Sequence, residues 1–301
     1  MRSNILIIAD MEGCPGITDM RQYDDCREKM IEETERVIQA VENCSNACIT
    51  VADCHNYGKN IVEYFSGKGY VCCEHIWSIK NVEKYDCAML IGFHPKKGED
   101  GFCPHTLRPD VDELFLGEKS IGEVELLINW LAGYGVPVVF VSGDSAVKKE
   151  LNGYNCVFYA ADRTGEKVSD RHALLEHMLS SIKMALDLPG NKEVCYNDSV
   201  IKVKLERENC YKWLPGEIFS IENGMVVFPD TEKFISSLLP FCEFLNLAEG
   251  YQRLRLKHLG KKIRENYACV EKDSRGNQLL KEKEWRALSD DEIGYLYRLL
   301  K

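Results

Sequence analysis

Asn4-Ile5-Leu6-Ile7-Ile8-Ala9-Asp10-Met11-Glu12-Gly13 is the stretch of sequence that decides the fold. Its apolar run is typical of a strand buried on both faces of a sheet, and we predict a strand at Asn4–Ala9. Strand side chains alternate, so Asp10 and Glu12 point the same way just beyond the strand. Open α/β sheets bind ligands at such carboxyl ends, which favours a metal site. Taken alone, the stretch also fits an Asp that caps a turn before a bending Gly.

Strand-like and helix-like segments alternate over the first 160 residues, which indicates an α/β protein. Further strands are predicted at Ala47–Ala52, Cys87–Gly92, Glu113–Leu116, Val136–Ser142 and Cys156–Ala160. Helices are predicted at Asp24–Asn43, Ile121–Ala132 and Asp170–Leu186. Several strands are continuous apolar runs, so we expect a largely parallel central sheet covered by helices.

The pattern changes after residue 190, and we predict three parts. Residues 1–190 are expected to form an α/β domain that carries the candidate metal site. Residues 191–250 form a smaller α+β domain, with strands at Ser199–Glu206 and Gly224–Phe228 and a helix at Thr231–Leu247 that Pro240 kinks or ends. Residues 251–301 form a charged helical tail of two helices.

The charge balance excludes some partners. The net charge is −10, which argues against general nucleic-acid binding. Residues 251–301 carry +5 and the remainder −15, so the basic tail either docks on an acidic surface or is a solvated helical face. No run approaches the ~20 apolar residues of a membrane span. Met1-Arg2-Ser3-Asn4 leads straight into the first strand, without a secretory segment, and we therefore expect a cytoplasmic protein with no membrane partner.

Fourteen cysteines are scattered along the chain, and none forms a Cys-x-x-Cys pair. We interpret them as small buried side chains in a reducing compartment. His75 follows Cys72-Cys73-Glu74, where a buried strand is favoured over a Cys/Cys/His zinc site.

Other potential metal ligands follow the predicted strands. His55 ends Asp53-Cys54-His55, His94 ends Gly92-Phe93-His94, and His105 lies eleven residues further on. Glu123 lies in the first turn of a predicted helix. Each has an ordinary interpretation as a loop histidine or a helix-terminal acid. Together, mixed imidazole and carboxylate donors suit zinc, or manganese and cobalt.

This ordered set resembles the zinc-dependent D-aminopeptidases, the family of the bacterial dipeptide-operon D-aminopeptidase. The shared motifs are Asp10-Met11-Glu12-Gly13, Asp53-Cys54-His55, Gly92-Phe93-His94, His105 at its eleven-residue offset, and Gly122-Glu123. Order and spacing agree through Gly143-Asp144, and a weaker likeness extends to about residue 250 at Trp213-Leu214-Pro215-Gly216.

The resemblance implies roles for six residues. Five would bind two zinc ions, with Asp10 bridging them; these are Asp10, Glu12, His55, His94 and Glu123. His105 would be the catalytic histidine that is not a ligand. It would move a proton to the leaving amine, stabilise the oxyanion, or attack covalently. The resemblance also implies a ring-type homo-oligomer that admits small peptides.

The sequence departs from the family pattern at two places. Cys54 replaces a frequent Ser; we expect a packed thiol that points away from the metals, with a metal-bound thiolate as the alternative. Cys103-Pro104 replaces small residues before His105. Asp53 is not a ligand in the implied set, and we expect it to support an imidazole N–H.

We therefore predict a dinuclear metallo-aminopeptidase that releases N-terminal, D-configured residues from short peptides or amino-acid amides. One alternative is another metal-dependent amide or ester hydrolase on the same scaffold. The other is a metal-binding assembly protein without turnover, against which the presence of His105 argues.

Overall fold

The structure is a computed structural model that describes residues 3–161, 171–188, 200–206, 220–242 and 245, and the backbone of 271–272 and 278–279. The chain divides into two compact units. The first comprises Met1–Tyr211 and Pro215–Ser237, and the second comprises Lys212–Leu214 and Leu238–Lys301. The two larger sheets and the site described below belong to the first unit.

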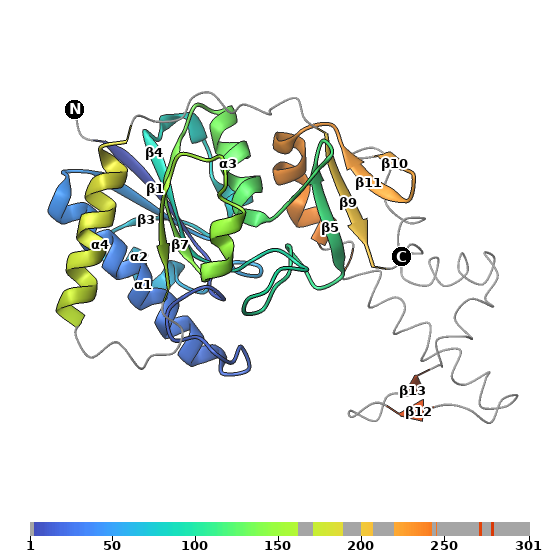
Figure 1. Cartoon of the computed structure of the whole chain (residues 1–301), viewed down its shortest axis with the longest axis horizontal. Coiled ribbons are helices and arrows are strands. Elements are labelled where there is room, and N and C mark those ends of the chain that lie inside the picture. The colour runs from blue at the N-terminus through green and yellow to red at the C-terminus, as the bar shows by residue number, and fades with distance from the viewer. Residues whose placement is uncertain are drawn as a thin grey trace, which may run out of the picture. The chain divides into compact units, whose positions relative to one another are not determined.

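A six-stranded parallel sheet forms the centre of this unit (Figure 1). Its strands are β1 (Asn4–Ala9), β2 (Cys48–Asp53), β3 (Val71–Cys73), β4 (Cys87–Phe93), β7 (Val138–Gly143) and β8 (Val157–Ala160). Their order is β3-β2-β1-β4-β7-β8. The chain builds outward from β1 in one direction and then returns to add β4 on its other side. The carboxyl ends of β1 and β4 therefore flank a topological switch point, where such sheets bind ligands.

Helices cover both faces of this sheet. They are α1 (Tyr23–Cys44), α2 (Val62–Gly67), α3 (Glu123–Gly133) and α4 (Arg171–Leu186), with short 3₁₀ turns η1 (Ile76–Ser78), η2 (Val82–Lys84) and η3 (Ser145–Lys149). Helix α1 packs against α4, and α3 packs on β4 and β7 and lies across the sheet from α4 (Figure 1).

Alternation along the strands explains the two covered faces. Ile5, Ile7 and Ala9 of β1 join the apolar cluster that includes residues of α1 and α4, whereas the buried Leu6 and Ile8 lie outside that cluster. Every residue of β4 and β7 is buried, which is why their sequences are continuous apolar runs. The predicted α/β class, with a largely parallel sheet covered by helices, is confirmed.

A second, five-stranded sheet is antiparallel, in the order β10-β11-β9-β5-β6. Its strands are β5 (Val111–Leu116), β6 (Lys119–Ile121), β9 (Ile201–Leu205), β10 (Ser220–Glu222) and β11 (Met225–Phe228). This sheet combines strands from both sides of residue 190 within one compact unit. The division into domains at 190 and 250 stays a prediction. Residues 231–242 are helical, so the helix continues past Pro240 and does not end there.

The prediction of two helices in the tail stays a prediction, and only four residues of the tail are described. Strands β12 (Glu271–Lys272) and β13 (Gln278–Leu279) pair antiparallel. The sequence between them, Asp273-Ser274-Arg275-Gly276-Asn277, is rich in residues that favour turns over helix. The rest of 251–301 lies outside the described residues. Among the described helices, none has both the length and the apolar character needed to cross a membrane.

Candidate metal and catalytic centre

Two glycines allow the ends of β1 and β4 to meet. The amide of Asp10 donates to Ile91 O at 2.7 Å, and that of Gly13 donates to Gly92 O at 2.7 Å. A Cβ atom on Gly13 would lie 1.8 Å from a backbone oxygen of Phe93. Gly92 has a φ of +75°, and its Cβ would lie 2.3 Å from Asp10 O. Only glycine fits both positions, and their contact brings the first two acids beside His94.

All five residues that the sequence analysis assigned as ligands converge here. Asp10 faces two histidines, with Oδ1 3.6 Å from His55 Nδ1 and Oδ2 3.6 Å from His94 Nε2. Glu12 Oε2 lies 3.0 Å from His55 Nδ1, and Glu123 Oε1 lies 3.3 Å from His94 Nε2. Each of the five residues is at most 9% exposed. The structure therefore places two imidazoles and three carboxylates in one buried cluster.

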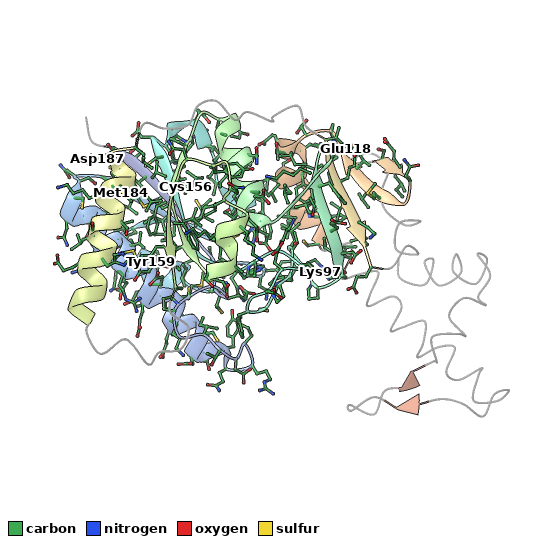
Figure 2. All side chains as sticks on the ribbon, viewed as in Figure 1. Lys97, Glu118, Cys156, Tyr159, Met184 and Asp187 are labelled. Atoms are coloured by element: carbon green, nitrogen blue, oxygen red, sulfur yellow. The ribbon has the colours of Figure 1, made fainter. Side chains whose placement is uncertain are left out.

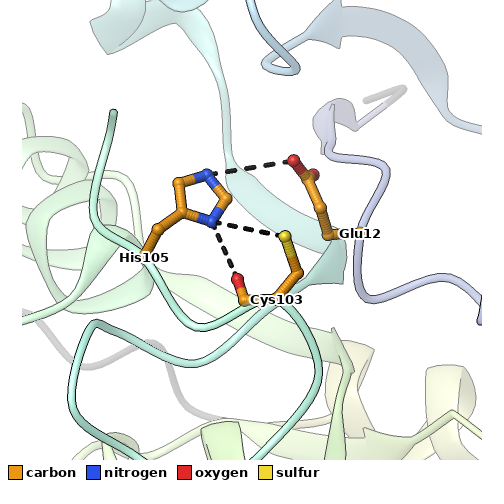
Figure 3. Close-up of side chains that lie close together, drawn as sticks. All are labelled: Glu12, Cys103 and His105. Carbon is orange, nitrogen blue, oxygen red and sulfur yellow. Dashed lines mark hydrogen bonds and ion pairs between the residues drawn. The ribbon is translucent and has the colours of Figure 1, made fainter. Parts of the chain in front are cut away.

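His105 lies at the edge of this cluster. Its ring stacks on that of His94, with centroids 3.9 Å apart and an angle of 7°. Its Nε2 lies 3.8 Å from Glu12 Oε1 (Figure 3). Nδ1 lies 2.8 Å from Cys103 O, and a carbonyl can only accept, so Nδ1 carries the proton. The other ring nitrogen, Nε2, then faces the carboxylate of Glu12.

The segment that carries His105, residues 95–110, is called here the His105 loop. The amide of His105 donates to Pro95 O, the amide of Phe102 to Asp144 Oδ2 at 3.1 Å, and that of Leu107 to Glu123 Oε1 at 2.7 Å. In the sequence, Asp144 is marked only by its place in a motif. The structure shows that its carboxylate holds the loop.

Two further features shape the same loop. Cys103 and Leu107 both have left-handed backbones, with φ of 50° and 62°. Such values are uncommon for residues other than glycine, and they turn the chain sharply on either side of His105. Lys97, labelled in Figure 2, pairs with Asp112 on β5 and with Glu206, which follows β9. The smaller sheet therefore anchors the beginning of the loop.

The carboxylates hold the two buried imidazoles in their charged form. Burial alone would lower the pKa of His55, but hydrogen bonds to Asp10 and Glu12 raise it to about 10. Burial also opposes the charged form of His94, yet the charge of Glu123 raises the pKa of His94 well above its usual value.

The acids respond in different directions. Burial, reinforced by the charge of Glu12, raises the pKa of Asp10 to about 6. Burial would also raise the pKa of Glu12, but the hydrogen bond with His55 lowers it. The pKa of Glu123 is likewise lowered, against the effect of burial, by the charge of His94. This cluster attracts positive charge, and metal ions would replace the imidazole protons.

The donor set fits a transition metal. Asp10 Oδ2 is buried and has no hydrogen-bond partner among the described residues, which is costly unless a cation approaches it. The residues fall into three groups of possible donors, and within each group one ligand atom per residue lies within 4.8 Å of the others. They are Asp10 with Glu12 and His94, His94 with His105 and Glu123, and Glu12 with Cys103 and His105. Imidazole and carboxylate donors suit zinc, manganese or cobalt.

The expected role of Asp53 is wrong. Its carboxylate supports backbone instead of an imidazole N–H, because it accepts from the amides of His55 at 3.2 Å and Ile61 at 3.1 Å. It also accepts from the side chain of Asn60 at 2.8 Å, which in turn donates to His55 O. Asp53 therefore fixes the turn that carries His55. No signal in the sequence marks Asn60.

Two other residues near the His55 turn are buried. Cys54 is 9% exposed and belongs to none of the donor groups found among the described residues, as expected for a packed thiol. Burial raises its pKa well above that of a free thiol. His75 precedes η1 and does not lie in a strand. Its ring stacks on that of Trp77, with the ring centroids 3.3 Å apart. It also hydrogen-bonds to the backbone of Cys54 and Asn56, the residues on either side of His55.

A comparison with protein families assigns the chain. Residues 3–187, more than half of its length, match peptidase family M55, described as D-aminopeptidase. The chain belongs to this D-aminopeptidase family. All of the residues assigned to the centre lie within the matched segment.

A curated D-aminopeptidase and a solved D-aminopeptidase structure are similar to this family member. The D-aminopeptidase of Bacillus subtilis (strain 168) is 27% identical over 153 residues, which span 47% of this chain and 56% of that protein. The match thus covers little more than half the length of this relative. The solved structure of the "Zn-dependent D-aminopeptidase DppA from Bacillus subtilis, a self-compartmentalizing protease" matches with a TM-score of 0.66 and 21% identity. It covers 81% of this chain and 98% of that chain, and shows that the fold is shared.

Proposed function

We propose that this protein is a dinuclear zinc aminopeptidase that releases N-terminal, D-configured residues from short peptides or amino-acid amides. The observation that carries the proposal is the convergence of five buried ligands and the exposed edge of His105 at one switch point. Family membership supports the D-aminopeptidase activity, and the zinc dependence of DppA supports zinc over manganese or cobalt.

The contacts of Asp10 support two ions. Its Oδ1 faces His55, which contacts Glu12, whereas its Oδ2 faces His94, which contacts Glu123. Glu12 and His55 would hold one ion, His94 and Glu123 the other, and Asp10 would bridge them. When bound, the ions supply a Lewis acid for the scissile carbonyl and lower the pKa of water.

His105 would transfer the proton. In the neutral ring, Cys103 O fixes the proton on Nδ1, so Nε2 can accept a proton from the attacking water and return it to the leaving amine. Stacking on His94 and the bond from its own amide to Pro95 hold the ring beside the carboxylates. The acidic cluster would attract the free ammonium group of an aminopeptidase substrate.

We also propose a cytoplasmic homo-oligomer of ring type. The cysteines are scattered along the sequence without a Cys-x-x-Cys pair, which fits a reducing compartment. The description of DppA as self-compartmentalizing supports an assembly. Light scattering of the purified protein tests it, and a monomer at assay concentrations would contradict it.

The test of function is hydrolysis of paired D- and L-alanine amides and dipeptides, before chelation, after chelation, and after zinc is restored. We expect zinc-dependent release of D-alanine with little release from the L series. Zinc-dependent cleavage of other amides or esters alone would favour the broader hydrolase. Bound zinc without turnover on any substrate would favour the assembly protein.

A further inference from the structure

Cys103, Glu12 and His105 form a group of donor atoms at the exposed edge of the centre, called here the Cys103 group (Figure 3). His105 Nε2, the nitrogen left unprotonated in the neutral ring, lies 3.8 Å from Glu12 Oε1, and the thiol of Cys103 lies 3.9 Å from Nδ1 of the same ring. One donor atom from each residue lies within 4.8 Å of the other two. That spacing allows three donors to bind one ion.

The two oxygens of Glu12 face different partners. Oε2 lies 3.0 Å from His55, inside the proposed zinc pair, whereas Oε1 faces His105. One oxygen can therefore serve the inner pair while the other serves the Cys103 group. The inner pair does not need Cys103, since its five ligands are complete without a thiol.

Exposure also separates the two sets of donors. The five inner residues are at most 9% exposed, but Cys103 is exposed and the side chain of His105 is 20% exposed. An ion can reach the Cys103 group from solvent without opening the core. A soft thiolate selects zinc and cadmium over manganese or magnesium.

We propose that Cys103, His105 and Glu12 bind one further thiophilic divalent cation, and that this ion inhibits turnover. Binding releases the thiol proton to solvent and changes no oxidation state. A neutral imidazole has one unprotonated nitrogen, and a cation bound there takes the lone pair that would accept a proton. The inhibitory effect rests on the proposed function; the binding of the ion does not.

Cadmium titration of the zinc-loaded protein tests the binding. Wild type and Cys103→Ser are compared by equilibrium dialysis and by the ultraviolet charge-transfer absorption of a cadmium thiolate. We expect Cys103→Ser to bind one cadmium ion fewer and to lose the corresponding absorption. Cys103→Gly should lose the same ion and absorption as Cys103→Ser, and glycine readily adopts the left-handed backbone at this position. Cys44→Ser, which removes another exposed thiol, is the matched control and should bind as wild type does.

Excess zinc tests the inhibition. For each variant the rate with excess zinc is divided by its own rate without it, so differences in basal rate cancel. We expect half-inhibition to need at least about tenfold more zinc in Cys103→Ser. Equal cadmium binding and absorption in wild type and Cys103→Ser would overturn the proposal. Loss of the cadmium signal with unchanged zinc inhibition would overturn the inhibitory role. A wild type inactive on all substrates would instead overturn the proposed function, and the cadmium result would still decide the binding.

Discussion

The buried sheet edge and the His105 loop build the centre in different ways. At the edge, the proposed ligands follow β1, β2 and β4 or begin α3, and each is at most 9% exposed. The loop extends from β4 to β5, carries the exposed Cys103, and has left-handed backbones on both sides of His105. Packing of the core fixes the geometry of the edge, whereas a few hydrogen bonds fix that of the loop.

This difference suggests a division of labour. Metal ligands must keep their positions through many turnovers, and buried strand ends provide that rigidity. An imidazole that moves a proton, the role proposed for His105, must reach both solvent and substrate, and a loop provides that access. Changes at the edge should therefore remove metal, whereas changes in the loop should slow turnover and leave metal in place.

Asp10→Asn should have the largest effect. The variant keeps the size of the side chain but loses the charge that bridges the two histidines. We expect loss of bound zinc and a fall in turnover of more than about 10⁴-fold, because the metal supplies several kcal/mol of transition-state stabilisation. Metal analysis and hydrolysis of D-alanine amide check this. Asp19→Asn removes a surface acid paired with Arg21 and is the control. An Asp10→Asn protein with full zinc content would refute the bridging role.

His105→Ala should separate the two regions most clearly. We expect turnover to fall by about 10²–10⁴-fold, the usual contribution of a proton-transferring side chain, with zinc content unchanged. The same metal and rate measurements apply. His177→Ala, an exposed histidine on α4, is the control. Loss of zinc from His105→Ala would mean that His105 is a ligand.

The edge could be predicted from the sequence because burial leaves a strong pattern. β1 has its predicted bounds, and β2, β4 and β7 lie within two residues of theirs. Strands that are apolar throughout must be covered on both faces, and polar residues directly after them must gather at one edge.

The loop and the smaller sheet could not be predicted in the same way. The pairing of β5 with β9 joins segments far apart in the chain, and neither sequence encodes the partner of the other. β3 has three residues, too few for a periodic pattern. The direction of the Cys103 thiol follows from a left-handed φ at a residue that is not glycine, which composition does not signal. The role of Asp53 could not be predicted because it accepts from backbone amides and from Asn60, and none of these partners has a sequence signature.

Asp144→Ala tests how firmly the loop is held. Its carboxylate accepts from the amides of Phe102 at 3.1 Å and Ala146 at 2.8 Å, so the substitution frees the loop on one side. We expect kcat to fall about tenfold with zinc content unchanged, since supporting residues of this kind contribute 10- to 100-fold.

Glu99→Gln is the matched control for this variant. Glu99 lies on the same loop and pairs with Lys149 at the surface, where an ion pair contributes little. Its kcat should match that of wild type. An equal loss in both variants would mean that the loop's charge matters more than its anchoring. Loss of zinc from Asp144→Ala would contradict the expectation that changes in the loop leave the metal in place.

His75 provides the smallest test, on the edge itself. Burial lowers the pKa of His75 from 6.5 to about 4, so the folded state holds this ring neutral. The His75 ring therefore binds a proton more tightly in the unfolded chain than in the folded protein. The contribution of neutral His75 to folding stability is complete above pH ~6.5 and is lost as pH falls toward ~4. The shift corresponds to a loss on the order of 3 kcal/mol over that range.

The measurement is urea unfolding of metal-free wild type and His75→Gln between pH 7 and pH 4. We expect the wild type to lose more stability over this range than His75→Gln, because a glutamine does not titrate. The raised pKa of Asp10 acts in the opposite direction, since its stabilising contribution is lost as pH rises through about 6. That effect is common to both proteins and cancels in their difference. Parallel curves would show that the turn carrying His55 does not depend on a neutral His75, and the rigidity of the edge would then rest on Asp53 and Asn60.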